Sequence, residues 1–460
     1  MRASIPQEWS SAKLGEVVEY GKTTKKSLAD VHDNTWVLEL EDIEKDSSRI
    51  MNRLYAKDRP FKSAKNSFKK GDVLYGKLRP YLNKVVISDA DGVCTTEIIP
   101  LNAESSSCNG YLFYWLKGRE FLDYVNSVSY GVNMPRLGTK DGLNAPIILA
   151  PLAEQKVIAE TLDSLLAQVE STKARLEGIP GILKQFRQSV LAAAVSGELT
   201  EDWREEHGKI LDFKKWLFGD LLVELRNGLS PKPNEEAKGF PILRINAVRS
   251  GQVSQNDIRH LECDTKTLKK YRLETGDLLF TRYNGSLDFV GVCGLIRDLQ
   301  YENLLYPDKL IRVRVHKSVL AKYVEIYFAS SKARDSMVDC VKTTSGQKGI
   351  SGQDIKSQAI KVPPIEEQEE IVRRVEELFG FADKVAAQVK TAMESVNHLT
   401  QSILAQAFSG ELTKDWREQN PDLISGENSA AALLERIKAE RAKLKPAPQP
   451  RELTKKATKS

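Results

Sequence analysis

The sequence predicts an α+β protein with two globular domains, related by a pseudo-twofold and separated by two long antiparallel coiled-coil helices. The first observation behind this prediction is a repeat. SGELTEDWRE at residues 196–205 returns as SGELTKDWRE at residues 409–418, an offset of 213. Each copy follows a long heptad pattern, and each heptad pattern follows a domain-sized segment with the same order of motifs. Repeats of this kind indicate a duplicated architecture.

The repeat divides the 460-residue chain into five parts, in keeping with the two or three domains expected at this length. These parts are a first domain over residues 1–150, a first helical spacer over 151–205, a second domain over 206–363, a second helical spacer over 364–418, and a C-terminal segment over 419–460.

Composition places the chain among soluble globular proteins, with 41% hydrophobic and 28% charged residues. No apolar run approaches the ~18 residues that a membrane span needs, and the first residues do not resemble a secretory signal. The expected location is therefore the cytoplasm, with no membrane partner. The five cysteines are scattered and form no CxxC pair, which favours reduced thiols over disulfides or a zinc site. No metal ligand is predicted.

The net charge of +5 is concentrated at the C-terminus. Residues 436–460 contain nine basic and two acidic residues, so this tail carries +7 and the remaining chain carries 5 − 7 = −2. Three prolines, Pro446, Pro448 and Pro450, lie within it. The tail is predicted to be a disordered arm.

The first domain is predicted to mix short strands with helices. Residues 36–44 alternate like a strand, residues 69–88 indicate strand–loop–strand, residues 110–128 indicate an amphipathic helix, and residues 145–152 indicate a short strand. The second domain repeats this order. Its matching segments are residues 240–250, residues 273–286, a helix at 319–341 and a glycine loop at 343–352.

Two long helices carry the heptad patterns, beginning near Glu154 and at residue 364. Apolar residues alternate at spacings of four and three, which is typical of a coiled-coil seam. Because the two halves of the chain are nearly equal in length, the two seams can pack against each other most simply if the helices are antiparallel. Pro180, between Gly178 and Gly181, is expected to kink or split the first helix. The first seam is Ile158, Leu162, Leu165, Val169, Leu176, Ile179, Leu183, Phe186 and Val190, with the polar Thr172 holding the place between Val169 and Leu176; the second is Ile371, Val375, Leu378, Ala382, Val385, Val389, Ala392, Val396, Leu399 and Ile403.

The sequence carries no recognisable catalytic motif. Five residues separate Gly15 from Gly21, whereas a phosphate-binding loop needs four. The Asp/Asn-Pro-Pro-Tyr/Phe tetrad of amino-methyltransferases and the GxGxxG, GxSxG and HExxH motifs are absent from the sequence. Asp72 and Asp277 each follow a glycine before a strand, which favours a structural turn. No catalytic residue is predicted.

The loops of both domains carry side chains suited to DNA. Arg and Lys can bridge guanine, Asn and Gln can bridge adenine, and Lys, Ser and Thr can hold phosphates. A solvated polar loop remains the alternative for any single residue. The candidates in the first domain are Lys22, Thr23, Thr24, Lys77, Arg79, Tyr81, Asn83, Tyr130, Asn133 and Arg136; those in the second are Arg244, Asn246, Arg282, Tyr283, Asn284, Ser286, Lys342, Thr343, Thr344, Ser345, Gln347 and Lys348.

Together these features resemble the specificity subunits of type I restriction–modification systems. The resemblance rests on tandem variable domains, each followed by a Pro-x-x-Glu-Gln motif at residues 151–155 or 364–368 and a long helix. It extends to about residue 440 and is strongest in the second half, with motifs such as GDLLFTRYNGSL and CVKTTSGQKGISGQDIKSQ. The first domain departs more from the known pattern, so a different first half-site is expected.

The resemblance implies a non-catalytic DNA reader. Each variable domain would be a target-recognition domain for one half of a split, asymmetric site in double-stranded DNA, and the helices would set the unread spacer. Two methyltransferase subunits would dock on the helices, and two ATP-dependent translocase/nuclease subunits would join for restriction. S-adenosylmethionine, Mg²⁺ and ATP would belong to these partners, with no cofactor in this chain. Trp203 and Trp416 of the repeat would be docking residues.

Two alternatives remain open at the level of the sequence. One is a self-contained DNA methyltransferase or nuclease, which the missing motifs disfavour. The other is a coiled-coil adaptor that does not read DNA, which would not need glycine-rich polar loops at matched places in both domains.

Overall fold

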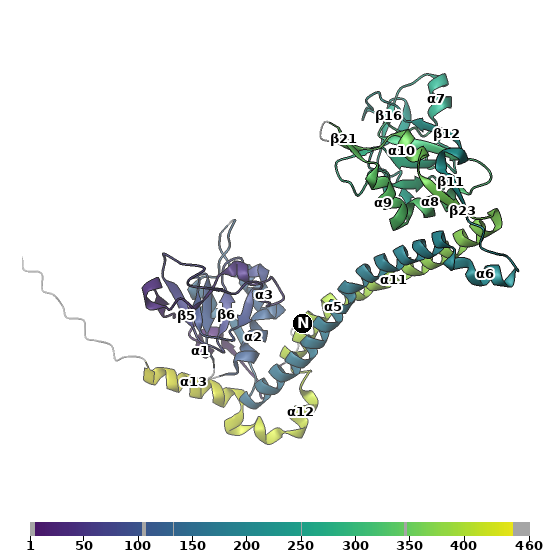
Figure 1. The fold of residues 1–460 in the computed structure, drawn as a ribbon. Coiled ribbons are helices and arrows are strands. Elements are labelled where there is room, and N and C mark those ends of the chain that lie inside the picture. Colours follow the sequence, from purple (N-terminus) through teal and green to yellow (C-terminus); the bar gives the residue numbers. More distant parts are fainter. Residues whose placement is uncertain (1–4, 104–106, 132, 250, 345–346, 445–460) are drawn as a thin grey trace, which may run out of the picture. The chain divides into compact units, whose positions relative to one another are not determined.

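The computed structural model describes residues 5–103, 107–131, 133–249, 251–344 and 347–444. The chain forms two compact units. Unit 1 combines residues 1–175 with 392–460, and unit 2 spans residues 176–391. Each unit holds one domain of mixed helices and strands and one part of each long helix, as Figure 1 shows unit by unit. Among the described residues, no helix has both the length and the apolar character needed to cross a membrane.

Domain 1 (residues 10–149) is built on short strands in three sheets. A five-stranded sheet has the order β2-β5-β8-β3-β4, a three-stranded sheet has the order β7-β6-β9, and β1 pairs with β10. Among the described strands of this domain, β3 and β8 pair in parallel and the other pairs are antiparallel. The strands are β1 (Ser10–Lys13), β2 (Lys25–Lys26), β3 (Trp36–Leu38), β4 (Leu54–Tyr55), β5 (Lys65–Phe68), β6 (Val73–Gly76), β7 (Val85–Ile87), β8 (Gly92–Cys94), β9 (Ile98–Leu101) and β10 (Pro146–Leu149); the helices are α1 (Leu14–Val17), α2 (Asn109–Lys117), α3 (Arg119–Val128) and α4 (Thr139–Asn144).

Domain 2 (residues 214–362) repeats the framework with a four-stranded sheet of order β12-β20-β17-β19 and a three-stranded sheet of order β18-β22-β21. The strands are β11 (Lys214–Leu217), β12 (Leu222–Asn227), β13 (Phe240–Leu243), β14 (Val248–Arg249), β15 (Gln252–Val253), β16 (Ile258–Leu261), β17 (Leu278–Thr281), β18 (Tyr283–Asn284), β19 (Cys293–Leu295), β20 (Leu310–Val315), β21 (Lys342–Thr344), β22 (Gln347–Gly349) and β23 (Ala359–Val362); the helices are α7 (Thr265–Tyr271), α8 (Ala321–Ala329), α9 (Ser331–Asp339) and α10 (Gly352–Lys356).

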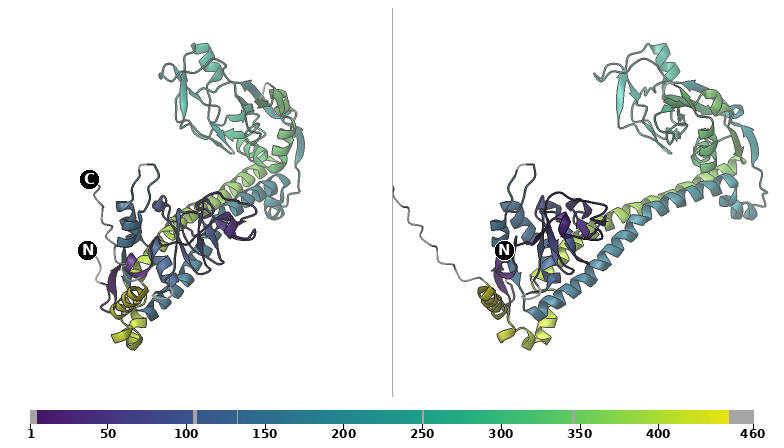
Figure 2. Two further views of the ribbon diagram at one scale, coloured as in Figure 1. Left: turned by 90° about the vertical axis from the view of Figure 1, so that its left-hand side faces the viewer. Right: turned by 60° about the vertical axis from the view of Figure 1, so that its left-hand side comes forward.

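The long helices are α5 (Leu152–Ser196) and α11 (Ile365–Phe408). In unit 2, Arg187 of α5 lies 2.8 Å from Asp383, and Leu199, just beyond α5, accepts a hydrogen bond from Arg374. A later residue at the end of α5 therefore contacts an earlier residue of α11, so the two helices are antiparallel. The two helices run side by side within each unit in both views of Figure 2. The predicted fold class, two mixed domains with two long antiparallel helices, is confirmed.

Three expectations about the elements need correction. Helix α5 is continuous through Pro180, so of the kink or split expected there the split is wrong, and the kink stays a prediction. The single helices predicted at 110–128 and 319–341 are two helices each, because Gly118 (ψ 152°) and Ser330 (ψ 147°) are extended. The strand predicted over residues 36–44 ends at Leu38 and a 3₁₀ turn follows.

The C-terminal segment also differs from expectation. After α12 (Lys414–Gln419), the chain forms α13 (Ala430–Leu444), so the first part of the predicted disordered arm is helical. Leu433, Leu434 and Ile437 are buried in the core of domain 1, which explains why a basic stretch becomes ordered. The remainder of the predicted arm lies outside the described residues.

Candidate functional site

The start of α5 carries a buried carboxylate that binds the second copy of the repeat. Glu154 is fully buried in unit 1. Its Oε1 accepts hydrogen bonds from the Thr413 hydroxyl at 2.6 Å and from Arg417 Nη1 at 2.7 Å. Its Oε2 accepts one from Trp9 Nε1 at 2.7 Å. A buried charge needs such pairing, because an uncompensated one costs several kcal/mol or more.

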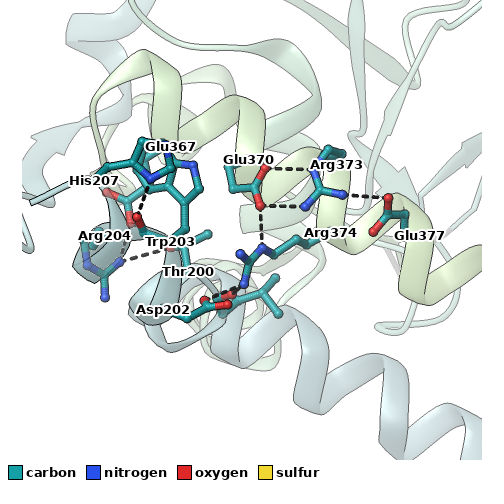
Figure 3. A network of polar contacts seen from close by, with 11 residues as sticks. Thr200, Asp202, Trp203, Arg204, His207, Glu367, Glu370, Arg373, Arg374 and Glu377 are labelled. Atoms are coloured by element: carbon teal, nitrogen blue, oxygen red, sulfur yellow. Dashed lines mark hydrogen bonds and ion pairs between the residues drawn. The ribbon is translucent and has the colours of Figure 1, made fainter. Parts of the chain in front are cut away.

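The same arrangement occurs in unit 2 with the roles of the repeats exchanged (Figure 3). Glu367, at the start of α11, is 1% exposed. The Thr200 hydroxyl donates to its Oε1 at 2.7 Å, and the Arg204 guanidinium forms an ion pair with the same oxygen. Arg204 also donates to the carbonyl of Gly197 at 2.7 Å. The start of each long helix is therefore hydrogen-bonded to the copy of the repeat that follows the end of the other long helix.

The glutamine that follows each glutamate anchors the helix to its own domain. Gln155 Oε1 accepts from the Ser107 hydroxyl and from the backbone N–H of Cys108, immediately before α2. Gln368 Oε1 accepts from the backbone N–H of Leu320, immediately before α8. Both glutamines are fully buried. The Pro-x-x-Glu-Gln motif therefore joins three parts of each unit: the domain, its helix and the repeat.

A second charged network surrounds the repeat in unit 2 (Figure 3). Arg374 donates to Asp202 and to Glu370, both at 2.6 Å. Arg373 donates two hydrogen bonds to Glu370, which lower the pKa of that carboxyl to about 2. The hydrogen bond from Arg374 lowers the pKa of Asp202. Trp203 is half-buried, with its ring centroid 4.8 Å from that of His207.

In domain 2, the structure brings together two of the loops predicted to read DNA. Strand β18, which follows Arg282, pairs with β22, and β22 pairs with β21. Tyr283 is opposite Gly349, Asn284 is opposite Lys348, and Thr343 is opposite Lys348 on the other side. This small sheet therefore collects Arg282, Tyr283, Asn284, Lys342, Thr343, Thr344, Gln347 and Lys348. The structure describes the backbone of Thr344 and Gln347 but not their side chains. Ser345 lies outside the described residues.

The ring of Tyr283 holds two cations at this sheet. The guanidinium of Arg282 lies 4.7 Å from the ring centroid and the Lys309 ammonium lies 4.8 Å from it. The backbone N–H of Arg282 donates to the carbonyl of Lys309 at 2.7 Å, which fixes the two chains side by side. Lys309 follows Pro307-Asp308 in the sequence and was not among the predicted residues. Its proximity to Tyr283 depends on a long-range pairing that no local motif marks.

Three other candidates in domain 2 differ from these in their surroundings. Arg244 and Asn246 lie on the loop after β13, and Arg244 forms an ion pair with Asp257 at 3.0 Å. The hydroxyl of Ser286 donates to Asp288 at 3.1 Å, and the backbone N–H of Ser286 donates to Asn284. Within this turn, Asn284 and Ser286 have structural partners.

Domain 1 brings together the equivalent loops. Leu78 forms an isolated antiparallel bridge with Arg136, and Tyr130 forms another with the same residue. The backbone N–H of Arg79 donates to the carbonyl of Pro135 at 2.7 Å. Residues 77–83 and 130–136 are therefore neighbours, as β18 and β21–β22 are in domain 2. Tyr81 is 52% exposed and Tyr130 is 62% exposed. Arg79 and Asn133 are also exposed and Lys77 is half-buried.

Some candidates in domain 1 lie elsewhere or have other roles. Asn83 is 3% exposed and has a left-handed backbone (φ 48°) at the end of a 3₁₀ turn, so its prediction as a DNA contact is corrected to a structural role. Arg136 forms an ion pair with Glu97 at 3.2 Å. Lys22, Thr23 and Thr24 lie apart from these bridges and line a hollow together with Lys69 and Arg441.

The predicted seam residues are mostly shielded from solvent. The exposed positions are Thr172 in the first seam and Leu399 in the second, which is 44% exposed. Near this end, α11 turns Leu404, Ala407 and Phe408 toward domain 1, and the ring of Phe408 contacts Tyr111 and Trp115. The buried seam residues are Ile158, Leu162, Val169, Val190, Ile371, Val375, Ala382 and Val396; the half-buried ones are Leu165, Leu176, Ile179, Leu183, Phe186, Leu378, Val385, Val389, Ala392 and Ile403.

The aspartates set aside as structural do close turns. Asp72 accepts a hydrogen bond from the backbone N–H of Lys69, and Asp277 accepts one from the backbone N–H of Glu274, both at 2.8 Å. Within the described residues, no three His, Cys, Asp or Glu side chains are placed to hold a metal ion.

Comparison with known proteins agrees with this duplicated arrangement. The family model of the type I restriction modification DNA specificity domain matches residues 6–180 and again residues 215–393. The EcoKI specificity subunit of Escherichia coli K12 is 60% identical over 344 residues, which cover 74% of each chain. The EcoDI specificity subunit of Escherichia coli is 32% identical over 465 residues, covering 95% of this chain and 96% of that one.

Solved structures share the fold. A chain from a type I restriction–modification complex superposes with a TM-score of 0.64 at 16% identity, covering 88% of this chain and 98% of that chain. The HsdS subunit of Thermoanaerobacter tengcongensis superposes with a TM-score of 0.57 at 19% identity, covering 89% of this chain and 98% of that chain. Two copies of the family domain, each followed by a helix locked to the other repeat, and extensive identity to named relatives lead to one conclusion: the chain belongs to the family of type I restriction enzyme specificity subunits.

Proposed function

We propose that this chain reads a bipartite, asymmetric site in double-stranded DNA and brings methyltransferase subunits to it. Domain 1 would read one half-site and domain 2 the other. The observation that carries the proposal is the matched clustering of polar loops on two domains of otherwise different sequence. The bridge of residues 77–83 to 130–136 in domain 1 corresponds to the β18-β22-β21 sheet in domain 2.

The side chains at these clusters suit DNA chemically. Domain 2 gathers Arg282, Asn284 and Lys348 beside an aromatic ring, and domain 1 gathers Lys77 and Arg79 beside exposed tyrosines. Arg and Lys hydrogen-bond guanine edges and phosphates, and Asn hydrogen-bonds adenine. The full proposed set is the predicted one without Asn83 and with Lys309 added. Because the two clusters differ in their residues, they would select different bases.

The constant parts would serve the assembly. The ten-residue repeats are nearly identical in the two halves, and the helices carry their seams at matching positions. This fits two copies of one methyltransferase subunit, with two ATP-dependent restriction subunits joining them in the cytoplasm. S-adenosylmethionine, Mg²⁺ and ATP would bind to those partners. The chain itself would contribute recognition and spacing rather than catalysis.

Mapping methylated adenines on DNA from a host that carries this chain and its methyltransferase would test the proposal. One split, asymmetric motif is expected. A purified complex that shows no sequence preference on a DNA library would contradict the reading role and favour an adaptor. Methylation by this chain alone would contradict the non-catalytic role.

A further inference from the structure

Helix α13 covers one face of domain 1. It packs on β1 and α1, with Leu433, Leu434 and Ile437 in the same buried cluster as Leu14 and Val17. Three polar contacts orient it. The backbone N–H of Ala430 donates to the carbonyl of Glu8 at 3.1 Å, Lys438 Nζ lies 3.6 Å from Glu16, and Arg441 donates to the carbonyl of Gly15 at 2.6 Å.

Domain 2 has the same face at an offset of 204. Ser10 of β1 pairs opposite Leu149, and Lys214 of β11 pairs opposite Val362. The short helix after β1 corresponds to the 3₁₀ turn Phe218–Leu221 after β11. Strand β11 begins ten residues after Arg204, whereas α13 begins 13 residues after Arg417. The segment between Arg204 and β11 is thus too short to contain a helix like α13.

This face of domain 2 exposes apolar side chains where domain 1 has small or polar ones. Trp216 stands for Ala12, Leu217 for Lys13 and Val223 for Glu19. Their exposed fractions are 42%, 54% and 67%. Ile210 and Leu211, on the segment leading into β11, are 84% and 57% exposed. Single exposed apolar residues need no explanation, but several on one segment mark an interaction surface. Because Trp216 and Leu217 are consecutive in β11, their side chains point to opposite sides of the strand, and the exposed apolar surface continues around it. We name this surface, formed by Ile210, Leu211, Trp216, Leu217 and Val223, the β11 face.

One charge beside the β11 face repeats a charge that orients α13. Exposed Asp220 stands where domain 1 has Glu16, the partner of Lys438. Asp212 stands where domain 1 has Glu8, whose backbone carbonyl contacts α13. A helix laid on this face in the manner of α13 would place a basic residue against Asp220. Lys214, on β11 itself, lies 3.7 Å from Asp212. The complementary ligand is therefore an amphipathic helix with an apolar stripe and Lys or Arg beside it.

We propose that the β11 face is a docking site for such a basic amphipathic helix carried by the methyltransferase subunit. The helix would occupy on domain 2 the position that α13 occupies on domain 1. The identity of the partner rests on the proposed function. Domain 1 fills its own face with α13, so this contact would form at one domain of the chain and make the two halves of the assembly unequal.

A photo-crosslinking residue in place of Val223, in the full chain copurified with its methyltransferase, tests the proposal. The expected adduct joins this chain to a methyltransferase peptide with apolar residues at helical spacing and adjacent Lys or Arg. The same probe in place of Leu299, another partly exposed position of domain 2, should give no such adduct. An adduct with a second copy of this chain, an adduct with DNA, or no intermolecular adduct would overturn it.

The variants Trp216→Glu and Asp220→Lys supply the second measurement. Each should weaken binding of the methyltransferase at least tenfold without lowering the unfolding midpoint, because both side chains are exposed. Glu16→Lys, the matched change on domain 1, should leave this binding unchanged. Unaltered binding by both domain 2 variants would refute the docking site. Loss of DNA sequence preference in the wild-type complex would instead refute the proposed function, so the two failures are distinguishable.

Discussion

Glu154 and Arg417 are 263 residues apart in the chain, and Arg417 Nη1 lies 2.7 Å from Glu154 Oε1. Glu367 and Arg204 repeat this ion pair at positions related by the offset of 213. The first half of the chain is thus fastened to the second by two reciprocal contacts, each within one compact unit.

Arg417→Ala should destabilise unit 1 by about 3–5 kcal/mol, because Glu154 would remain buried without its guanidinium partner. Urea unfolding followed by a probe in domain 1 measures this. Arg119→Ala is the control, since the side chain of Arg119 is 82% exposed and its pair with Asp123 should contribute no more than about 0.5 kcal/mol. A decrease of less than about 1 kcal/mol in the unfolding free energy of the Arg417 variant would show that the buried ion pair does not stabilise unit 1 appreciably.

The network around Glu370 predicts a pH dependence of stability. Arg373 and Arg374 lower the pKa of Glu370 in the folded state to about 2, below the ~4.3 of an unfolded chain. A depressed carboxyl pKa stabilises the folded state above the unfolded pKa, and the contribution disappears as pH falls toward 2. The thermal unfolding midpoint of Glu370→Gln should therefore lie below that of the wild type at pH 6 and converge with it between pH 4 and pH 2. A constant difference across this range would contradict the assignment.

Arg282→Ala should weaken binding of the complex to its site by ~1–3 kcal/mol and relax the preference at one position of the half-site read by domain 2. The reason is that Tyr283 and the adjacent β22 hold Arg282 at the polar cluster. Binding to a randomised DNA library measures both effects. Lys390→Ala, which removes one charge from α11, serves as the control. Equal weakening on every sequence would identify Arg282 as a phosphate contact instead.

The length of the two long helices is expected to set the spacing between the DNA half-sites. Inserting seven residues in both α5 and α11 preserves the heptad pattern and lengthens each helix by ~10 Å. Methylation should then move to sites whose spacer is longer by about three base pairs, at 3.4 Å for each. Sequencing of methylated DNA from the host reads this directly. An insertion in α5 alone should abolish methylation, because the seams lose their match. An unchanged spacer in the double insertion would refute the ruler role.

Local patterns in the sequence determined much of this protein. The repeat at residues 196–205 and 409–418, the heptads from Ile158 and from Ile371, and the alternating strands depend on spacing, which can be read without knowing any partner. The resemblance to a family followed from the same features. Even the polar loops at Arg282 and Lys342 were identifiable, because glycine and cationic residues cluster there.

Tertiary structure decided which residues meet. Glu154 could not be assigned to Arg417 from spacing, since burial of a carboxylate depends on chains brought together over 263 positions. Asn83 carries the side chain of a base reader, yet folding buries it. Residues 436–444 have the composition of a solvated arm, yet α13 is ordered because domain 1 offers Leu433 and Ile437 an apolar face. Periodicity is local and so is written in the sequence, whereas burial depends on long-range packing and is decided only when the whole unit folds.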